Sequence, residues 1–129
     1  MKRIFYFAVL FVLTSFITSF SKEVKSTAKG GDWHSKKTWV GGKFPGKSDD
    51  VVITGKVICR NSFICENIIV EKDGTLIMNT GNSVVCGVLN KFVLYGCFEI
   101  SETTVFKIKG RFDKQSECFQ NLGMLEVGY

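Results

Sequence analysis

From residue 50 onward, the chain is a succession of short apolar or alternating runs, each three to six residues long. Turn residues such as Asp73 and Gly74 separate these runs, and no window of helical length carries an apolar stripe with a period of 3.6 residues. The pattern therefore predicts an all-β domain. The expected strands are 51–53, 57–60, 68–71, 75–78, 84–88, 92–95, 97–100, 104–109 and 124–127.

A repeat within these runs predicts how the strands are arranged. Segments that begin at Gly74, Gly96 and Gly123 each read glycine, any residue, apolar, any residue, apolar, and these glycines lie 22 and 27 residues apart. A period of roughly 20–30 residues built from three short strands is typical of one coil of a parallel β-solenoid, whose inner face is buried by the next coil. An antiparallel sandwich with similar strands is the alternative. The solenoid predicts two inward stacks, one of Leu76, Phe98 and Leu125 and one of Met78, Ile100 and Val127.

Composition favours a sheet over a helical domain. In residues 22–129, Val, Ile and Thr total 27, whereas Leu and Ala total 6. Branched side chains fit a pleated surface, whereas Ala and Leu favour helices. The aromatic and aliphatic content excludes a disordered chain. A length of 129 residues is enough for one domain and too short for two.

Residues 1–21 are expected to be a secretory signal peptide. Lys2 and Arg3 precede an apolar run, and small residues lead to a cleavage site before Lys22. The run is short for a bilayer span, and an uncleaved N-terminal anchor is the alternative. The mature chain is therefore expected to be exported to the periplasm, the outer surface or the medium, without remaining in the membrane.

The charge pattern does not indicate a nucleic-acid partner. Loss of Lys2 and Arg3 with the signal lowers the formal net charge from +5 to +3. The remaining lysines are spread along the chain, whereas nucleic-acid binders gather theirs on one face. This distribution predicts a solvated protein surface.

The mature chain divides into a linker and one domain. Residues 22–29 are polar and lysine-rich, which is typical of a linker. Residues 30–50 are Gly-rich and irregular, and they hold both tryptophans and the only proline. We therefore expect a single β-solenoid domain at residues 30–129, with a cap at 30–50 and coils at 51–129.

A solenoid needs such a cap because its end exposes apolar side chains and unpaired strand edges. We expect Trp39 to lie over the interior of the first coil, with Trp33 nearer its rim. Asp49 and Asp50 are expected to accept backbone N–H bonds from the turn that precedes the first strand. The expected cap residues are Trp33, Trp39, Phe44, Pro45, Asp49 and Asp50.

The segment 31–53 also resembles a known motif. It contains a Trp, a short polar stretch, Thr38-Trp39, a Gly-rich turn, Pro45-Gly46 and a pair of aspartates before the first strand. This order is similar to the N-terminal cap of secreted bacterial right-handed parallel β-helix proteins, common in the Bacteroidetes, and distantly to the eight-glycine extracellular domain of animal surface proteins. The resemblance implies a right-handed β-helix. In larger members of that family, the cap precedes adhesive or carbohydrate-active regions.

Five cysteines in an exported chain leave at least one without an intramolecular partner. Cys65 and Cys86 are separated by 21 residues, as are Cys97 and Cys118, and this distance is close to one coil. Equivalent positions on adjacent coils lie near enough for a bond, so these pairs are the candidate disulfides. Buried free thiols that behave as small apolar core residues are the alternative.

A cation site is weakly supported. Asp32, His34, Asp49 and Asp50 could form a cluster, but zinc prefers several Cys or His ligands and calcium needs more oxygens. Turn-capping roles are therefore expected for these side chains. No metal or other cofactor is predicted.

The expected function is a non-catalytic structural or binding module of the cell surface or periplasm. Stacked coils display regular rows of side chains that suit a repetitive polymer, so the expected partner is a glycan or a surface protein. The last coil is also a candidate for self-association. A polysaccharide-active enzyme is one alternative, with Glu99 and Glu126 at equivalent repeat positions as paired carboxylates. Another is the truncated cap of a longer adhesin without separate activity.

Overall fold

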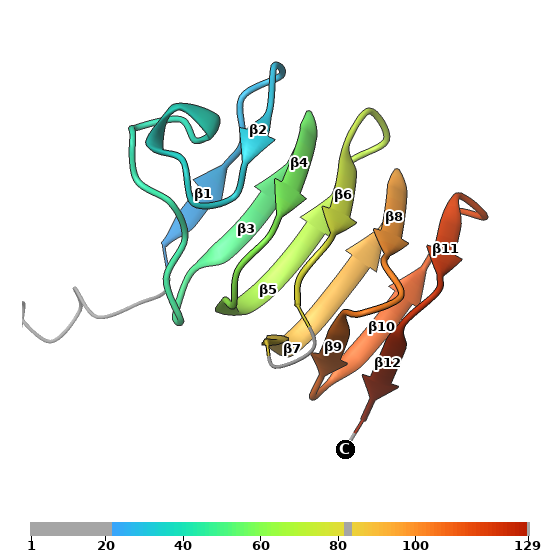
Figure 1. Cartoon of the computed structure of the whole chain (residues 1–129). Helices are drawn as coiled ribbons and strands as arrows, with labels where there is room; N and C mark the ends of the chain where they lie inside the picture. Colours follow the sequence, from blue (N-terminus) through green and yellow to red (C-terminus); the bar gives the residue numbers. More distant parts are fainter. Residues whose placement is uncertain (1–21, 82–83, 129) are drawn as a thin grey trace, which may run out of the picture.

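The computed structural model describes residues 22–81 and 84–128, so the signal peptide expected at residues 1–21 lies outside the described residues. The described residues form twelve β-strands and one short 3₁₀ helix, η2 (Lys36–Thr38). Figure 1 shows the strands stacked side by side along one axis. The strands are β1 (Glu23–Lys25), β2 (Gly31–Asp32), β3 (Asp50–Ile53), β4 (Lys56–Cys59), β5 (Ile64–Val70), β6 (Thr75–Met78), β7 (Val85–Leu94), β8 (Cys97–Ile100), β9 (Val105–Ile108), β10 (Arg111–Lys114), β11 (Phe119–Asn121) and β12 (Met124–Val127).

The named strands pair in parallel and form two sheets. The five-stranded sheet has the order β11-β8-β6-β4-β2, and the seven-stranded sheet has the order β1-β3-β5-β7-β9-β12, with β10 also paired to β7. Neighbours in each sheet are not consecutive in the chain, so the backbone winds as a β-solenoid of about four turns (Figure 1). The all-β solenoid predicted from the repeat is confirmed.

Strand β7 serves two sides of its coil. Its first half, Val85–Val88, pairs with β9, and its second half, Lys91–Leu94, pairs with β10. The runs expected at 84–88 and 92–95 are therefore parts of one strand. With the strand of the five-stranded sheet, these halves give each coil three segments, as the repeat predicted.

The predicted inward stacks are present over two coils. Leu76 faces Phe98 and Met78 faces Ile100 in the β6–β8 register, and all four side chains are buried. The next residue along the Phe98 row is Phe119, not Leu125. The rings of Phe98 and Phe119 stack with their centroids 5.5 Å apart.

Leu125 and Val127 lie elsewhere, so their predicted register was wrong. In the β12–β9 pair they stand opposite Phe106 and Ile108, on the seven-stranded sheet. The predicted contact between Phe98 and Leu125 is therefore replaced by the pairing of Leu125 with Phe106.

Close backbone approach at the corners explains the error. A Cβ on Gly96 would lie 2.2 Å from the carbonyl oxygen of Gly74, so these two glycines stack at one corner. A Cβ on Gly123 would lie 2.3 Å from the carbonyl oxygen of Ser101, at a different corner. Both corners exclude a side chain, so the same glycine–strand pattern recurs at positions that are not equivalent.

Residues 22–29 contain an edge strand, which corrects their interpretation as a linker. Strand β1 pairs in parallel with β3, and Val24 and Ser26 are both buried. Val24 stands between two charged residues, so it supplies one inward position in a segment that is otherwise polar. The overall polarity of the segment hid this alternation.

Both tryptophans are buried against the first coil. Trp33 is 0% exposed and stacks on Phe63, with ring centroids 3.9 Å apart. Trp39 is 2% exposed and meets the Trp33 ring edge-on, at 5.2 Å between centroids. The Nε1–H of Trp39 donates a hydrogen bond to the carbonyl oxygen of Trp33 at 2.7 Å. Trp33 is therefore not the rim residue that the sequence predicted, because its ring fills the space beside Phe63.

Truncation of the central ring tests the stacking. Phe98 packs between Phe92 and Phe119, with centroids 4.7 and 5.5 Å away. Phe98→Ala should lower the free energy of unfolding by about 3–5 kcal/mol, measured by urea denaturation. Leu122→Ala is the control, because Leu122 is 53% exposed, and its effect should stay within about 0.5 kcal/mol. A loss below about 1 kcal/mol for Phe98→Ala would contradict the core position of this ring.

Two conservative tryptophan variants separate hydrogen bonding from ring size. The Trp39 indole donates to the Trp33 carbonyl, whereas the Trp33 Nε1 has no hydrogen-bond partner within residues 22–81 and 84–128. Trp39→Phe should therefore cost about 1–3 kcal/mol more than Trp33→Phe, because it leaves a buried carbonyl without its donor. Urea unfolding of both variants gives the difference. An equal or reversed order would contradict this prediction.

Candidate functional site

Two rows of side chains lie side by side on the outer face of the seven-stranded sheet. The parallel register brings one residue from each of β1, β3, β5 and β7 into line, and residues two positions further along face the same way. The first row is polar and the second is apolar in its centre. The polar row is Glu23, Asp50, Asn67 and Lys91, and the apolar row is Val52, Ile69 and Val93.

These rows line a cleft of about 410 Å³. Val52 and Val93 are only 8% and 6% exposed, although neither belongs to the core cluster inside the solenoid. Their neighbours on the outer face therefore shield the apolar row. At a strand spacing of about 4.8 Å, the four aligned strands give the cleft a length of about 14 Å.

Asn67 holds the polar row together. Its Nδ2 donates to Asp50 Oδ1 at 2.7 Å, and its Oδ1 accepts the backbone N–H of Lys91 at 3.0 Å. The β5–β7 register shifts between Cys65 and Asn67, and this irregularity places Asn67 opposite Lys91. One amide thereby connects a carboxylate on β3 with the backbone of β7.

The residues of this cleft did not stand out in the sequence. Glu23 lies in a segment that was interpreted as a linker, and Asn67 and Lys91 belong to unremarkable strand positions. Alternation within each strand could have placed them on the outer face. Their alignment with one another depends on the strand register, which the repeat gave only in part.

A second hollow of about 510 Å³ lies between the cap loop and the turn before β5. Phe44 is 45% exposed at this hollow and meets the His34 ring at 5.4 Å between centroids. His34 Nε2 lies 3.2 Å from the carbonyl oxygen of Ser62. Phe44 therefore does not cover the first coil, which corrects its expected role, whereas Pro45 is buried beside it. The two tryptophans already occupy the space that Phe44 would have filled.

The two adjacent aspartates have different partners. The Asp49 carboxylate accepts the backbone N–H of Gly46 at 2.7 Å, which is the turn bond predicted for it. Asp50 begins β3, and its carboxylate accepts the side-chain amide of Asn67, not a turn N–H. The prediction for Asp50 was wrong because strand alternation directs its side chain onto the outer face.

Asp32 and His34 lie in the cap and are not part of a metal cluster. Asp32 accepts the backbone N–H of His34 at 2.8 Å and pairs with Arg60 at 3.1 Å. Within the described residues, no group of three or more His, Cys, Asp or Glu side chains is arranged to hold a metal ion. Asp32 therefore has the role of a turn-capping residue.

Glu99 and Glu126 do not form a carboxylate pair. Glu99 is on β8 of the five-stranded sheet, opposite Gln120. Glu126 is on β12 of the seven-stranded sheet, where its carboxylate pairs with Lys107 at 3.7 Å. The corner that displaced Leu125 also separates these two glutamates.

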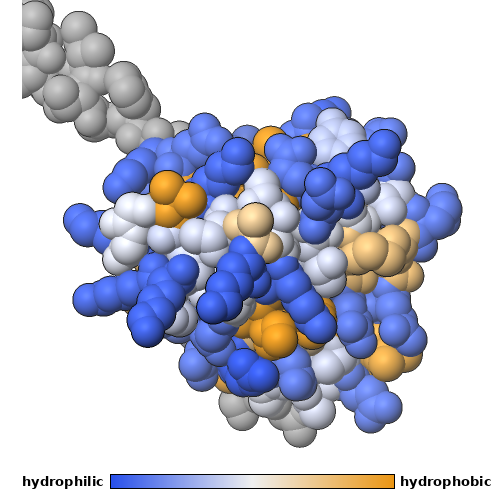
Figure 2. Space-filling model, turned by 90° about the horizontal axis from the view of Figure 1, so that it is seen from above, coloured by the Kyte–Doolittle hydropathy of each residue, from blue (hydrophilic) through white to orange (hydrophobic). Residues whose placement is uncertain are grey.

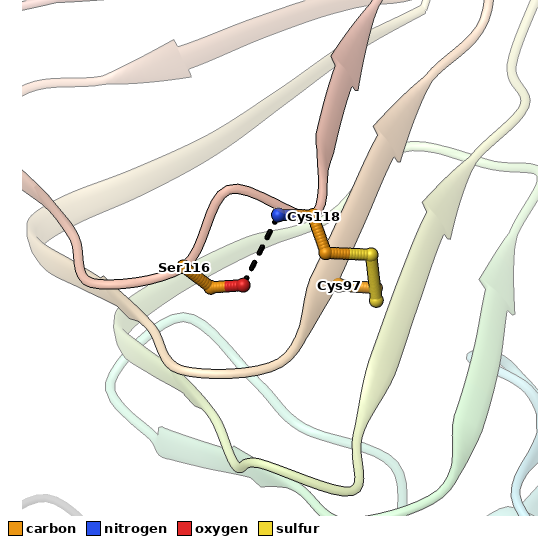
Figure 3. Close-up of a disulfide and its surroundings, with 3 residues drawn as sticks. All are labelled: Cys97, Ser116 and Cys118. Carbon is orange, nitrogen blue, oxygen red and sulfur yellow. Dashed lines mark hydrogen bonds between the residues drawn. A yellow bond between two sulfur atoms is a disulfide. The ribbon is translucent and has the colours of Figure 1, made fainter.

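One of the two candidate disulfides is present. Cys97 and Cys118 are bonded, with their Cα atoms 4.7 Å apart, and the bond joins β8 to the segment before β11. Figure 3 shows this bond together with the hydrogen bond that the Cys118 N–H donates to Ser116 Oγ at 3.1 Å. The bond ties two successive coils at one edge of the five-stranded sheet.

The other candidate pair is not bonded. Cys65 stands opposite Val88 and Cys86 stands opposite Phe106, and both cysteines are free and buried. The bulge in β5–β7 displaces Cys65 from the position that the separation of 21 residues implied. Burial raises the pKa of the Cys65 thiol above its ordinary value, and the nearby Asp50 carboxylate adds to this effect.

The face of the molecule seen in Figure 2 is mainly hydrophilic, with small separate apolar patches. No helix within residues 22–81 or 84–128 has the length and apolar character to span a bilayer. No family model, curated protein or solved structure matches the chain. Inference about function therefore begins from the solenoid and its outer-face cleft.

Proposed function

We propose that the protein is an exported, non-catalytic binding module that holds a glycan chain in the outer-face cleft. The observation that carries this proposal is the juxtaposition of a polar row and an apolar row over four strands. A sugar ring has hydroxyl groups at its edge and C–H groups on its faces. Both rows therefore find matching groups on the same ligand.

The mixture of polar groups favours a glycan over a charged polymer. Glu23 and Asp50 supply hydrogen-bond acceptors, Asn67 is an amide, and Lys91 supplies donors. Hydroxyl groups both donate and accept, so a sugar can pair with each of these groups. A nucleic acid would instead require a row with a strong excess of positive charge.

The position of the cleft favours a glycan over an extended peptide. Peptides commonly add to the edge of a sheet, where free backbone groups form a ladder. The cleft lies on a sheet face, where neighbouring strands already use those backbone groups. Recognition there depends on side chains, and rows repeated about every 4.8 Å suit a polymer of repeating units.

The proposed export has separate support. The first 21 residues have the pattern of a signal peptide, and the cap resembles that of secreted bacterial β-helix proteins. The Cys97–Cys118 bond also fits an oxidising compartment, because disulfides persist there.

Two variants of isoleucine test the cleft. Ile69 and Ile77 are both half-buried outward residues of the same type, but Ile69 lines the cleft and Ile77 lies on the five-stranded sheet. After a glycan array identifies a ligand, Ile69→Arg should weaken its affinity at least about tenfold in titration calorimetry, or about 1.4 kcal/mol, by filling the cleft. Ile77→Arg should leave affinity unchanged. Equal affinity in both variants, or no binding to any glycan, would contradict the proposal.

The enzyme alternative depends on the two carboxylates of the cleft. Glu23 and Asp50 are directly opposite in the β1–β3 register, and retaining glycosidases use two carboxyl groups about 5–5.5 Å apart. Hydrolysis of a bound glycan, abolished by both Glu23→Gln and Asp50→Asn, would replace the binding proposal with this one. Intact ligand after prolonged incubation supports the non-catalytic module.

We also propose that the last coil pairs with the same coil of a second copy. Phe119 and Leu125 are only partly buried, although they pack against the core, and Met124 and Val127 are 54% and 46% exposed. The first coil is covered by the tryptophans, so only like ends of two copies are open to each other. Such an association is two-fold and closes at a dimer without growing into a fibre.

Sedimentation velocity tests this pairing. The wild-type chain should associate into a dimer as its concentration rises, and Val127→Lys should shift the equilibrium to monomer by charging the exposed strand. Val40→Lys is the control, because Val40 is 63% exposed in the cap. A monomer at every concentration, or equal effects of both variants, would contradict the pairing.

A further inference from the structure

Two buried cysteines meet at one carbonyl group. Cys59 ends β4, Cys86 lies in β7, and both side chains are 0% exposed. The Asn61 carbonyl oxygen accepts from Cys59 Sγ at 3.0 Å and from Cys86 Sγ at 3.5 Å. Two thiols that donate to a single oxygen are themselves neighbours, although they come from different sheets.

The thiols also interact with each other. Their mutual hydrogen bond is the largest influence on both groups, and it raises the pKa of Cys59 while lowering the pKa of Cys86. Burial opposes the lowering at Cys86. Cys86 is therefore the sulfur of this pair that more readily becomes a thiolate.

The third free cysteine has a different environment. Cys65 Sγ lies 3.8 Å from the carbonyl oxygen of Asn67, and it makes no printed contact with the Asn61 carbonyl. Its residue stands opposite Val88 in the β5–β7 register. The geometry thus singles out Cys59, not Cys65, as the neighbour of Cys86.

We infer that Cys59 and Cys86 are a site of oxidative modification, at which a second disulfide forms by exchange with a low-molecular-weight disulfide such as oxidised glutathione. This inference does not depend on the proposed function. The bond would join β4 to β7 and so tie successive coils, as Cys97–Cys118 does further along the solenoid.

The exchange balances in two steps. The Cys86 thiolate attacks one sulfur of oxidised glutathione, which forms a mixed disulfide and releases one glutathione thiolate that takes up the Cys86 proton. Cys59 then loses its proton to solvent and attacks the Cys86 sulfur, which releases the second glutathione as a thiolate that is protonated in turn. Two protein thiols are oxidised, and one glutathione disulfide is reduced to two thiols.

Refolding in a glutathione redox buffer tests the inference on the full chain. Both sulfurs are buried, so the reagent must reach them while the coils form. The refolded protein should lose two further hydrogens in mass beyond those lost at Cys97–Cys118, and Cys65 should be the only one of its five cysteines that reacts with a thiol reagent after denaturation. Peptide mapping without reductant should recover Cys59 joined to Cys86. The midpoint of urea unfolding should rise relative to protein with that bond open.

Matched variants separate the partners. Cys65→Ser should retain the additional mass loss, whereas Cys59→Ser and Cys86→Ser should abolish it and keep a hydroxyl donor for the Asn61 carbonyl. Cys86 linked to Cys65 would overturn the inference. So would three free thiols in a refolded wild-type chain in which Cys97–Cys118 has formed. Peptide mapping of the wild type decides the question even if a variant fails to fold.

Discussion

The covering of each inward row by the next coil is the constraint on which this structure depends. A single coil has only a few apolar residues on its inner side, so it cannot bury them by itself. Leu76 is buried because Phe98 stacks beside it, and Phe98 is buried in turn beside Phe119. The parallel register follows, because equal positions must coincide from one coil to the next. Residues at the corners are then pressed together, which is why Gly96 stacks on Gly74.

The same constraint makes the two ends of the solenoid different. At the first coil, Trp33 and Trp39 replace the missing neighbour and supply large apolar surfaces. The Trp33 ring stacks on Phe63, so the cap continues the inner packing and does more than shield it. At the last coil no described segment has this role, and Leu125 stays partly exposed. This asymmetry is the basis of the proposed pairing of like ends.

Inner stacking also determines what lies on the outer face. Once Val51 and Ile68 coincide inside, Asp50 and Asn67 must coincide outside, because successive side chains of a strand point to opposite faces. The outer-face cleft is therefore a consequence of the register that buries the core. Its chemistry can vary, since outward side chains carry little of the packing.

The sequence by itself determined the fold class and the broad position of the cap. Alternating short runs, corner glycines and β-branched composition were enough to predict a parallel solenoid, because each reflects local backbone geometry or the burial of one face. The bond between Cys97 and Cys118 also followed from a separation close to one coil. These features repeat along the chain, so counting residues could find them.

Only the tertiary structure decided which repeats are equivalent. Cys65 and Cys86 have the same separation of 21 residues as the bonded pair, yet Cys86 meets Cys59 across the interior. Gly123 repeats the pattern of Gly96 at another corner. Counting along the chain fails here because the corners differ in length and a bulge shifts the β5–β7 register, whereas contact depends on position around the coil.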